Sequence, residues 1–333
     1  MCGRYASSSR PEDLVEEFEV DEDRTAQSAR SILVAPQSPP AGAPDFNMAP
    51  TKQAPVVLTR ASRGEIDAAP TRQLRLLTWG LVPSWARDFK AGLRMINARA
   101  ESLLDKSSFA KAAIARRCLV PADGWYEWQV SPTALDANGK PRKHPFFVHR
   151  SDGVPLAMAG LYEFWRDKSL GEDDPDAWLT TYAIIPSAAE PGLDRIHERQ
   201  PLVLEREDWA DWLDPKQTDP AAIRAHLTFS EPGRFDAYPV GSAVNSSTTT
   251  VSNCSFPRRA RTSWERWTPH PARSSGDESR ASSQERPGDS YASRYGAGSP
   301  LAPARPTRNP GSRARRRGLV VVGRPAGADV LDR

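Results

Sequence analysis

CLVPADGWYEWQV, residues 118–130, is the stretch that decides the fold of this chain. Aromatic and β-branched residues dominate it, and Pro, Asp and Gly break it, which is typical of short strands separated by bends. Three segments of the same character follow: HPFFVH (144–149), PLAMAGLYEFW (155–165) and LTTYAIIP (179–186). This succession predicts a β-rich body.

Outside this stretch, the pattern predicts a long surface loop over residues 21–46, rich in Pro, Ala, Ser and Asp. The order of elements shows no repeating βαβ unit. We therefore predict an α+β fold, a strongly bent, barrel-like mixed β-sheet with peripheral helices, in a single domain. The other predicted elements are strands at 54–59 and 73–79 and short helices near 11–18, 107–117, 206–213 and 220–227.

The composition changes after residue 245. Residues 246–333 contain 16 Arg, no Lys and 7 acidic residues, which gives a net charge of +9, and they are rich in Ser, Pro and Gly. Such a segment buries too little apolar surface to offset its ordering entropy. We predict a folded body over residues 1–245, net charge −6, and a disordered basic tail over 246–333. Translation out of frame is the alternative explanation of the tail.

Several classes of protein are excluded by the rest of the chain. No run approaches the roughly 20 apolar residues of a membrane span, and the first residues lack the apolar core of a secretory signal. Three cysteines, Cys2, Cys118 and Cys254, cannot all pair with each other, and none forms a C-x-x-C motif. We expect a monomer of the reducing cytoplasm, without a membrane or small-molecule partner.

The N-terminus reads Met1-Cys2-Gly3-Arg4. Because the side chain of Cys2 is small, we expect Met1 to be removed, leaving an α-amine and a thiol on adjacent carbons. The amine condenses with an aldehyde to an imine, and the thiol then closes a five-membered thiazolidine. The two groups titrate near pH 8 and about 8.5, so both have a reactive fraction at neutral pH. A Cys at this position is also common without any such role.

Two neighbouring segments, WGLVPSWARD (79–88) and NARAES (97–102), combine aromatic and basic residues. Exposed Trp79 and Trp85 near Arg94 and Arg99 would suit base stacking and phosphate contact on a single DNA strand. The alternative is that both tryptophans belong to the core.

Glu127 lies between Tyr126 and Trp128 in GWYEW. A carboxyl group in apolar surroundings tends to have a raised pKa and to act as a general acid. The alternative is a surface carboxylate on an edge strand, sharing one face with Trp125 and Gln129.

His197 stands among charged residues in DRIHERQPLVL, residues 194–204. A histidine in this setting can move protons near neutral pH, and the alternative is a solvated side chain. The remaining four histidines lack the spacing of metal ligands, so we expect no metal site and no cofactor.

Considered together, MCGRYA, NMAPT, WGLVPSWA, NARAES, CLVPADGWYEW, AGLYEFW and RIHERQP occur here in that order. The set closely resembles the SOS-response-associated peptidase family, also called abasic site processing proteins, over roughly residues 2–245. The resemblance implies an α+β fold with a groove for single-stranded DNA. It also implies a thiazolidine crosslink between the N-terminal Cys and an abasic site, formed during the response to DNA damage.

The resemblance also implies roles for individual residues. The catalytic matches are Cys2 as nucleophile, Asn97 as the amide that holds the amine and sugar, Glu127 and His197. The DNA-binding matches are Arg4, Pro50, Trp79, Leu81 and Arg99.

The chain departs from the family pattern at Gln200, where the family usually has Met, and after AVN (243–245), where the basic tail begins. Two other functions are consistent with the residues: a cysteine peptidase with a Cys2–His197 dyad, as the family name suggests, and a non-covalent reader of modified or unpaired bases.

Overall fold

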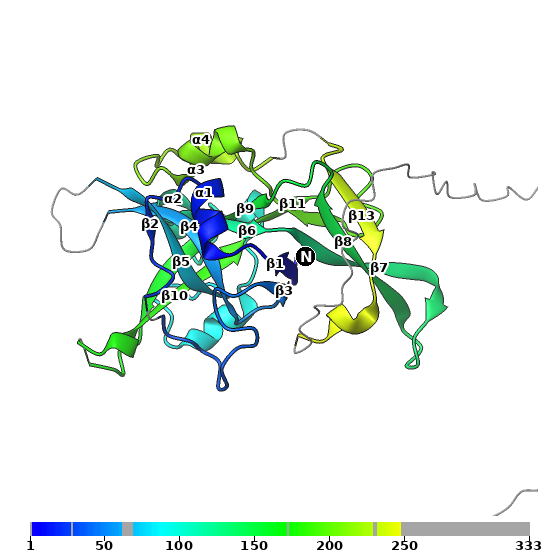
Figure 1. Cartoon of the computed structure of the whole chain (residues 1–333), viewed down its shortest axis with the longest axis horizontal. Coiled ribbons are helices and arrows are strands. Elements are labelled where there is room, and N and C mark those ends of the chain that lie inside the picture. Colours follow the sequence, from blue (N-terminus) through cyan, green and yellow to red (C-terminus); the bar gives the residue numbers. More distant parts are fainter. Residues whose placement is uncertain (1, 28, 62–68, 172, 229–231, 248–333) are drawn as a thin grey trace, which may run out of the picture. The chain divides into compact units, whose positions relative to one another are not determined.

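The structure, a computed structural model, describes residues 2–27, 29–61, 69–171, 173–228 and 232–247 (Figure 1). The predicted basic tail lies outside the described residues from residue 248 onward. The strands are β1 (Tyr5–Ser7), β2 (Glu22–Asp23), β3 (Asp45–Met48), β4 (Gln53–Arg60), β5 (Thr71–Trp79), β6 (Arg117–Ala122), β7 (Gly124–Leu135), β8 (Pro141–Arg150), β9 (Leu156–Arg166), β10 (Trp178–Ile184), β11 (Pro186–Ala188), β12 (Arg199–Pro201) and β13 (Phe235–Pro239).

The helical elements of the described ranges are short. They are α1 (Pro11–Glu17), α2 (Ala110–Ala115), α3 (Trp209–Leu213), α4 (Pro220–Ala225) and the 3₁₀ turns η1 (Phe89–Arg94), η2 (Ala100–Ser102), η3 (Pro175–Ala177), η4 (Arg206–Asp208) and η5 (Ser242–Asn245). The helices expected from the sequence are all present, with three main differences in their bounds. Helix α2 begins three residues after and ends two residues before its predicted limits, α4 ends two residues early, and the predicted helix at 206–213 is divided into η4 and α3. The predicted loop over 21–46 also contains the two-residue strand β2 and the start of β3.

A barrel-like sheet forms the larger part of the body. Its strand order is β10-β9-β6-β4-β5-β2, and β10 also pairs with β5, which closes a ring of five strands. The closing pair is parallel, with Thr181 opposite Thr78, whereas β9 pairs antiparallel with both β6 and β10. The predicted α+β class and the barrel-like mixed sheet are therefore confirmed.

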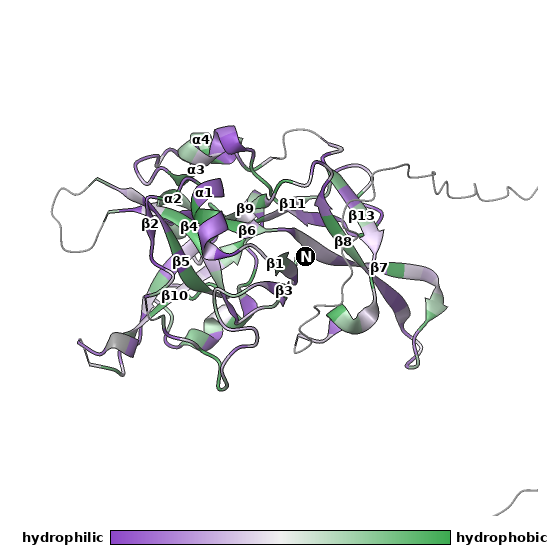
Figure 2. Ribbon diagram, viewed as in Figure 1, coloured by the Kyte–Doolittle hydropathy of each residue, from purple (hydrophilic) through white to green (hydrophobic). Residues whose placement is uncertain are grey.

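The central strands are buried on both faces, which explains their continuous apolar sequence. In β4, Val56 and Leu58 join one apolar cluster, while Val57 between them joins another that includes residues of the helices. In β6, Cys118 joins the cluster of Val56 and Leu58, and Leu119 joins the cluster of Val57. Figure 2 shows these strands as mostly hydrophobic ribbons, covered on one side by α1–α4. The helix-free cluster is the one that contains the N-terminal residues.

A second, antiparallel sheet has the order β13-β8-β7-β1-β3. The segment 118–130 joins the two sheets, because it leaves the barrel as β6 and enters the second sheet as β7. At the corner, the Asp123 carboxylate accepts the Ser8 N–H at 2.7 Å, and the Asp123 N–H donates to the Ala6 carbonyl at 2.8 Å. The corner therefore fixes β1 against β7, next to the N-terminus.

Gly124 permits a close approach at this corner. A Cβ at this position would lie 2.4 Å from the Val148 carbonyl oxygen and 2.5 Å from the Phe147 ring. We expect Gly124→Ala to lower the free energy of unfolding by about 1–3 kcal/mol, because the backbone must shift to admit the methyl group. Urea denaturation measures this change. Gly171→Ala is the control, since its added Cβ meets nothing within 4 Å. Equal stability of the two variants would contradict the prediction.

Candidate active site

Cys2 lies three residues before the first residue of β1, Tyr5, and is fully buried. Strand β1 sits between β7 and β3, and the Tyr126 N–H donates to the Arg4 carbonyl at 2.9 Å, so the N-terminal residues are held in the middle of the second sheet. Burial, and then the nearby Glu127 carboxylate, raise the pKa of the Cys2 thiol. The thiol is therefore protonated, out of solvent and close to Glu127.

Asn97 fixes the position of Cys2. Its Nδ2 donates to the Cys2 carbonyl oxygen at 2.9 Å. Hydrogen bonds of its two neighbours hold its backbone in place. The Ala98 N–H donates to the carbonyl of Ile184 at the end of β10, and the Ile184 N–H donates to the carbonyl of Ile96. Asn97 Oδ1 is buried and has no hydrogen-bond partner among the described residues. The Asn97 side chain thus holds Cys2 through its Nδ2 and has an available acceptor at its Oδ1.

Glu127 is a buried residue of β7, with only 4% of its surface exposed. The strand is internal at this end, because β8 pairs with it on one side and β1 on the other. Burial raises the pKa of its carboxyl group to about 7. The alternative of an exposed carboxylate on an edge strand is therefore wrong, and the group can both give and accept a proton at neutral pH.

His197 is half-buried in the loop between β11 and β12, which Leu193 and Ile196 anchor in the core. Its Nδ1 accepts the Arg199 N–H at 3.0 Å. Burial is the main cause that lowers the pKa of the imidazole. The ring is consequently neutral at pH 7 with its proton on Nε2.

Glu127 and His197 line one small pocket. Its other lining residues are Trp125, Val148, Leu193, Ile196, Arg199 and Gln200. Arg199 of this pocket also donates to the Glu101 carboxylate at 2.9 Å, which ties the histidine loop to the NARAES segment. The structure therefore brings the four predicted catalytic residues into one region: Cys2 contacts Asn97 and lies near Glu127, and Glu127 shares a pocket with His197.

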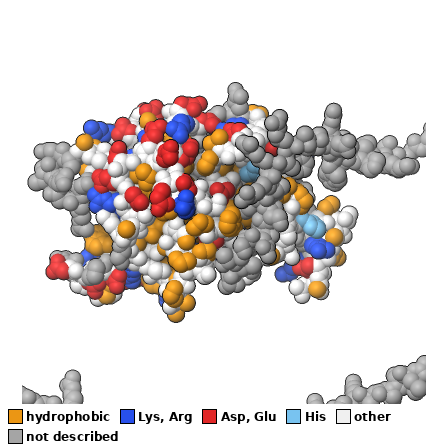
Figure 3. Space-filling view, in the orientation of Figure 1, with side chains coloured by type: hydrophobic (Ala, Val, Ile, Leu, Met, Phe, Trp, Pro, Cys, Tyr) orange, Lys and Arg blue, Asp and Glu red, His pale blue; other side chains and the backbone are white. Residues whose placement is uncertain are grey.

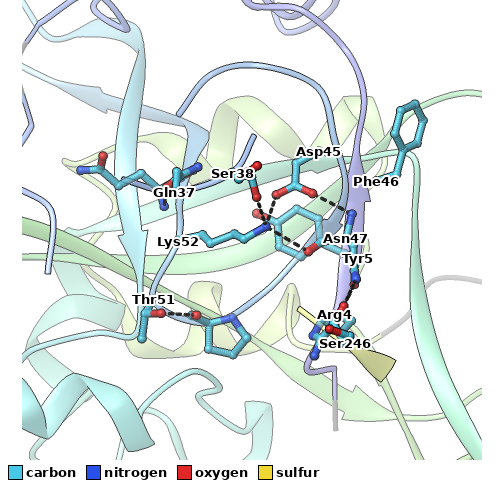
Figure 4. Close-up of polar contacts among 12 residues, drawn as sticks. Arg4, Tyr5, Gln37, Ser38, Asp45, Phe46, Asn47, Thr51, Lys52 and Ser246 are labelled. Atoms are coloured by element: carbon cyan, nitrogen blue, oxygen red, sulfur yellow. Dashed lines mark hydrogen bonds and ion pairs between the residues drawn. The ribbon is translucent and has the colours of Figure 1, made fainter. Parts of the chain in front are cut away.

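Arg4 belongs to a polar network shown in Figure 4. It donates to Asn47 Oδ1 at 2.7 Å and to the Val244 carbonyl at 2.8 Å, while Lys52 Nζ and Asp45 form a buried ion pair of 2.7 Å beside it. Arg4 thus fastens the N-terminal strand to the end of the body. A phosphate contact would have to use its remaining donors.

Two of the predicted DNA-binding side chains do not reach the surface. Trp79 is fully buried, and its Nε1 donates to the Ile96 carbonyl at 2.9 Å; Leu81 is also fully buried. The expectation of an exposed Trp79 is therefore wrong, because its indole packs against Tyr5 and Tyr182 in the core.

Pro50 is half-buried in the turn between β3 and β4. The next residue, Thr51, has φ of 76°, a strained conformation for a β-branched residue. The turn is held by the Thr51 N–H, which donates to the Trp79 carbonyl at 2.8 Å. The Trp79 backbone therefore holds the turn that contains Pro50.

Trp85 is the exposed aromatic residue of the WGLVPSWARD segment, with 60% of its surface accessible. Arg94 and Arg99 are exposed too, and Arg99 lies two residues after Asn97. Figure 3 shows acidic and basic side chains mingled around α1, in keeping with the net negative body. A nucleic-acid site on this body must therefore rest on a local group of cations.

Within the described ranges, no group of three or more His, Cys, Asp or Glu side chains is arranged to hold a metal ion. The same ranges contain no helix that is long and apolar enough to cross a membrane.

The fold and this site define a class of protein. The family model described as SOS response associated peptidase (SRAP) matches residues 1–247, and the chain belongs to this family. The resemblance seen in the sequence is confirmed.

Curated relatives carry a common name. The abasic site processing protein YoqW of Bacillus subtilis (strain 168) is 36% identical over 248 residues, covering 74% of this chain and 95% of YoqW. YobE of the same organism, also named abasic site processing protein, is 34% identical over 248 residues, with coverage of 74% and 97%. The abasic site processing protein HMCES of Pongo abelii is 28% identical over 288 residues, with coverage of 77% and 76%.

Two crystal structures share the fold. A protein from Bacteroides thetaiotaomicron aligns with a TM-score of 0.54 at 22% identity, covering 74% of this chain and 97% of its own. A protein from Bordetella bronchiseptica aligns with a TM-score of 0.53 at 21% identity, with coverage of 72% and 100%. At these identities the likeness establishes the fold alone.

Proposed function

We propose that this protein binds abasic sites in single-stranded DNA and, after removal of Met1, bonds Cys2 covalently to the damaged sugar as a thiazolidine. The observation that carries the proposal is the placement of Cys2: it is buried, held through its carbonyl by Asn97 at 2.9 Å, and close to a carboxyl group whose pKa is raised to about 7. The relatives named above are abasic site processing proteins.

The first step opens the sugar. An abasic deoxyribose is mostly a closed hemiacetal, and its aldehyde appears when the C1′–O4′ bond breaks and a proton passes from O1′ to O4′ through water. Because His197 Nδ1 accepts the Arg199 N–H, the neutral ring presents Nε2–H to the sugar. We assign it to hydrogen bonding with O4′, where it stabilises the charge that develops on that oxygen.

The second step forms the imine. The Cys2 amine attacks C1′, and the electron pair of the carbonyl moves to its oxygen. Glu127, protonated at or below pH 7, gives its proton to this oxygen and takes one from the amine nitrogen, which produces the carbinolamine. Glu127 then gives this second proton to the hydroxyl, which leaves as water while the nitrogen lone pair forms the C=N bond, and the last nitrogen proton returns to Glu127. Asn97 Oδ1 accepts an N–H of the amine and directs its lone pair toward C1′. The gain is mainly positional, since nucleophile and sugar are held together.

The third step closes the ring. The Cys2 sulfur bonds to C1′, and the thiol proton passes to the imine nitrogen. Carbon, sulfur and nitrogen keep their oxidation states, so the reaction consumes no oxidant. Burial raises the pKa of the Cys2 thiol, which disfavours the free thiolate that a peptidase nucleophile needs. The closed product no longer offers the aldehyde that leads to strand scission by β-elimination.

One gel tests the proposal. Mature protein is incubated with single-stranded DNA that contains one abasic site, and the mixture is then denatured. A shifted band that survives heat and detergent is the expected result. A band lost in detergent would indicate a non-covalent reader, and cleavage of casein without a shifted band would indicate a peptidase; either result overturns the proposal.

We place this chemistry in the cytoplasm, with a monomer acting on the DNA. Both cysteines in the described ranges, Cys2 and Cys118, are free thiols, as a reducing compartment maintains them.

We further propose that Arg99 contacts a phosphate beside the abasic site. Arg99→Ala should reduce the slope of log affinity against log salt by about 0.7, the value for one lost contact on a single strand. Fluorescence anisotropy across a salt series measures the slope. Arg224→Ala on α4 is the matched control, because that side chain is also exposed but lies on a peripheral helix. A slope that changes equally in both variants would refute a specific contact.

A further inference from the structure

Two arginines point into the barrel at one of its ends. The helices cover the outside of the ring, so the helix-free cluster, which includes Leu58 of β4 and Leu77 of β5, fills its interior. Alternate residues of a strand point to the same side of the sheet. Arg60 and Arg75, each two residues from one of these leucines, therefore point inward. Both side chains are half-buried, and the antiparallel register puts the end of β4 beside the start of β5.

The two arginines meet at one aromatic pair, Tyr162 and Phe164 of β9. Arg60 Cζ lies 4.5 Å from the centroid of the Phe164 ring, and the centroids of the two aromatic rings are 5.6 Å apart, edge to face. Burial raises the pKa of the Tyr162 hydroxyl to about 12, and the charges of Arg60 and Arg75 both act in the opposite direction. Both guanidinium groups are therefore close to this hydroxyl.

Neither guanidinium group has a carboxylate partner among the described residues. Arg60 Nε donates to the Ala61 carbonyl at 3.3 Å, and Arg75 Nε donates to Gln73 Oε1 at 2.8 Å. The two terminal nitrogens of each arginine have no hydrogen-bond or ion-pair partner in the part of the chain that the structure describes, and neither has the Tyr162 hydroxyl. The mouth of the barrel thus presents several donors that await an acceptor.

The direction of Arg75 is fixed from below. Gln73 is fully buried, and its Nε2 donates to Thr71 Oγ1 at 3.0 Å, while the Thr71 hydroxyl donates to the Glu22 carboxylate at 2.6 Å. Gln73 Oε1 is thereby aimed at Arg75 Nε, and the terminal nitrogens of the guanidinium group are directed away from it. Arg75 is held in place and is not a loose surface side chain.

The local charge is positive. Each of the two further arginines whose charges act on this group is paired with a glutamate, Arg24 with Glu22 and Arg116 with Glu163. Burial, and then the charges of Arg60 and Arg24, lower the pKa of the Arg75 guanidinium. Half-buried like charges without a counterion destabilise the folded chain, and a bound anion would remove this cost.

We propose that Arg60, Arg75 and the Tyr162 hydroxyl form a binding site for a phosphate group at this mouth of the barrel. Each guanidinium fork can bind two oxygens of a phosphate through parallel N–H···O bonds, and the phenol supplies a further O–H. A carboxylate, with two oxygens and one charge, would leave part of this donor set unused. The match in charge and in number of oxygens therefore favours phosphate.

This site is separate from the one that contains Cys2. Leu58, the interior neighbour of Arg60, lies opposite Cys118 near the start of β6, and β6 runs from there to the corner at Asp123, which holds β1. In Figure 1 the end of the β4–β5 pair points away from the N-terminus. The phosphate site and Cys2 lie at opposite ends of β6, so the inference goes beyond the proposed function and does not depend on it.

Calorimetric titration of the full-length protein with inorganic phosphate, at constant ionic strength balanced with chloride, tests the site. We expect Arg60→Gln and Arg75→Gln each to weaken phosphate binding by about 10-fold or more, because each removes a charged donor. Tyr162→Phe, which removes one neutral donor, should weaken it by about 5-fold. Arg224→Gln is the matched control, since Arg224 is an exposed arginine of α4, and it should bind as the wild type does.

Thermal melting in chloride alone gives an independent readout. Arg75→Gln should melt at the wild-type temperature or above it, because the substitution removes repulsion between like charges. A clear fall in its melting temperature would contradict the unpaired state of Arg75 on which the inference rests. No phosphate binding by the wild type, or equal binding by both arginine variants and the control, would overturn the site.

Two further ligands distinguish the sources of the phosphate. If the phosphate belongs to a small molecule, a nucleoside monophosphate should show the same dependence on Arg75 as inorganic phosphate, while single-stranded DNA without an abasic site should bind Arg75→Gln and wild type equally. If it belongs to a DNA strand, the affinity of the DNA should fall in Arg75→Gln and not in Arg224→Gln. Both results support a phosphate site and differ only in its occupant.

Discussion

Cys2→Ser is expected to abolish the denaturation-resistant adduct with abasic DNA. A serine at the N-terminus keeps the α-amine, which still condenses with the aldehyde, but its hydroxyl is a much weaker nucleophile than a thiol for ring closure. The imine should therefore form and reverse. Reduction with cyanoborohydride should convert it to a stable band, whereas omission of the reductant should leave no band after denaturation.

Cys118→Ser provides the control for this result. Cys118 is the other cysteine of the described ranges, and it is equally buried, in β6 of the barrel. The variant should crosslink at the wild-type rate once its stability has been checked. An undiminished adduct from Cys2→Ser, or loss of the adduct from Cys118→Ser alone, would assign the chemistry to a different group.

Glu127→Gln and His197→Ala should each slow crosslinking by about 10²-fold or more while leaving DNA affinity intact. Gln keeps the size of the buried side chain but cannot give up a proton, and Ala removes the Nε2–H. Single-turnover rates at saturating DNA measure the effect. Glu163→Gln is the control, since Glu163 is also buried but pairs with Arg116 at 2.7 Å in β9. Wild-type rates for both site variants would refute the assignment.

The pH dependence of the rate gives a second test of Glu127. Its carboxyl group, with a pKa raised to about 7, is neutral below that pH and charged above it, so its supply of protons falls as pH rises through 7. The Cys2 amine, with a pKa near 8, loses reactivity as pH falls. The product is a bell-shaped profile between these values. Glu127→Gln should lose the alkaline limb; retention of that limb would mean that another group titrates.

The pattern of apolar segments predicted the class of fold and a barrel-like sheet, but not which strands close the ring. Residues 118–130, 144–149, 155–165 and 179–186 were recognisable as strands because aromatic and β-branched residues fill them. The parallel pairing of β10 with β5, which closes the ring, joins residues about a hundred positions apart and leaves no local signal.

Side-chain environments were harder to predict than strands. Spacing along β7 could not distinguish an exposed Glu127 from a buried one, because its burial depends on β1 and β8 pairing on either side. Trp79 and Trp85 occupy the same segment, yet one is fully buried and the other 60% exposed. The difference comes from the packing of Tyr5 and Tyr182 on Trp79, which only the folded chain brings about.

The amino-acid sequence was enough to predict the chemistry proposed for this protein, from the adjacent amine and thiol latent at Cys2 and from the ordered motifs that contain Asn97, Glu127 and His197. The pKa values and hydrogen bonds of these groups depend on the folded chain. Burial sets the pKa of Glu127 near 7, and the amide of Asn97 holds Cys2. Desolvation and hydrogen-bond geometry depend on atoms brought together from distant segments, so they are properties of the packed chain and not of any motif within it.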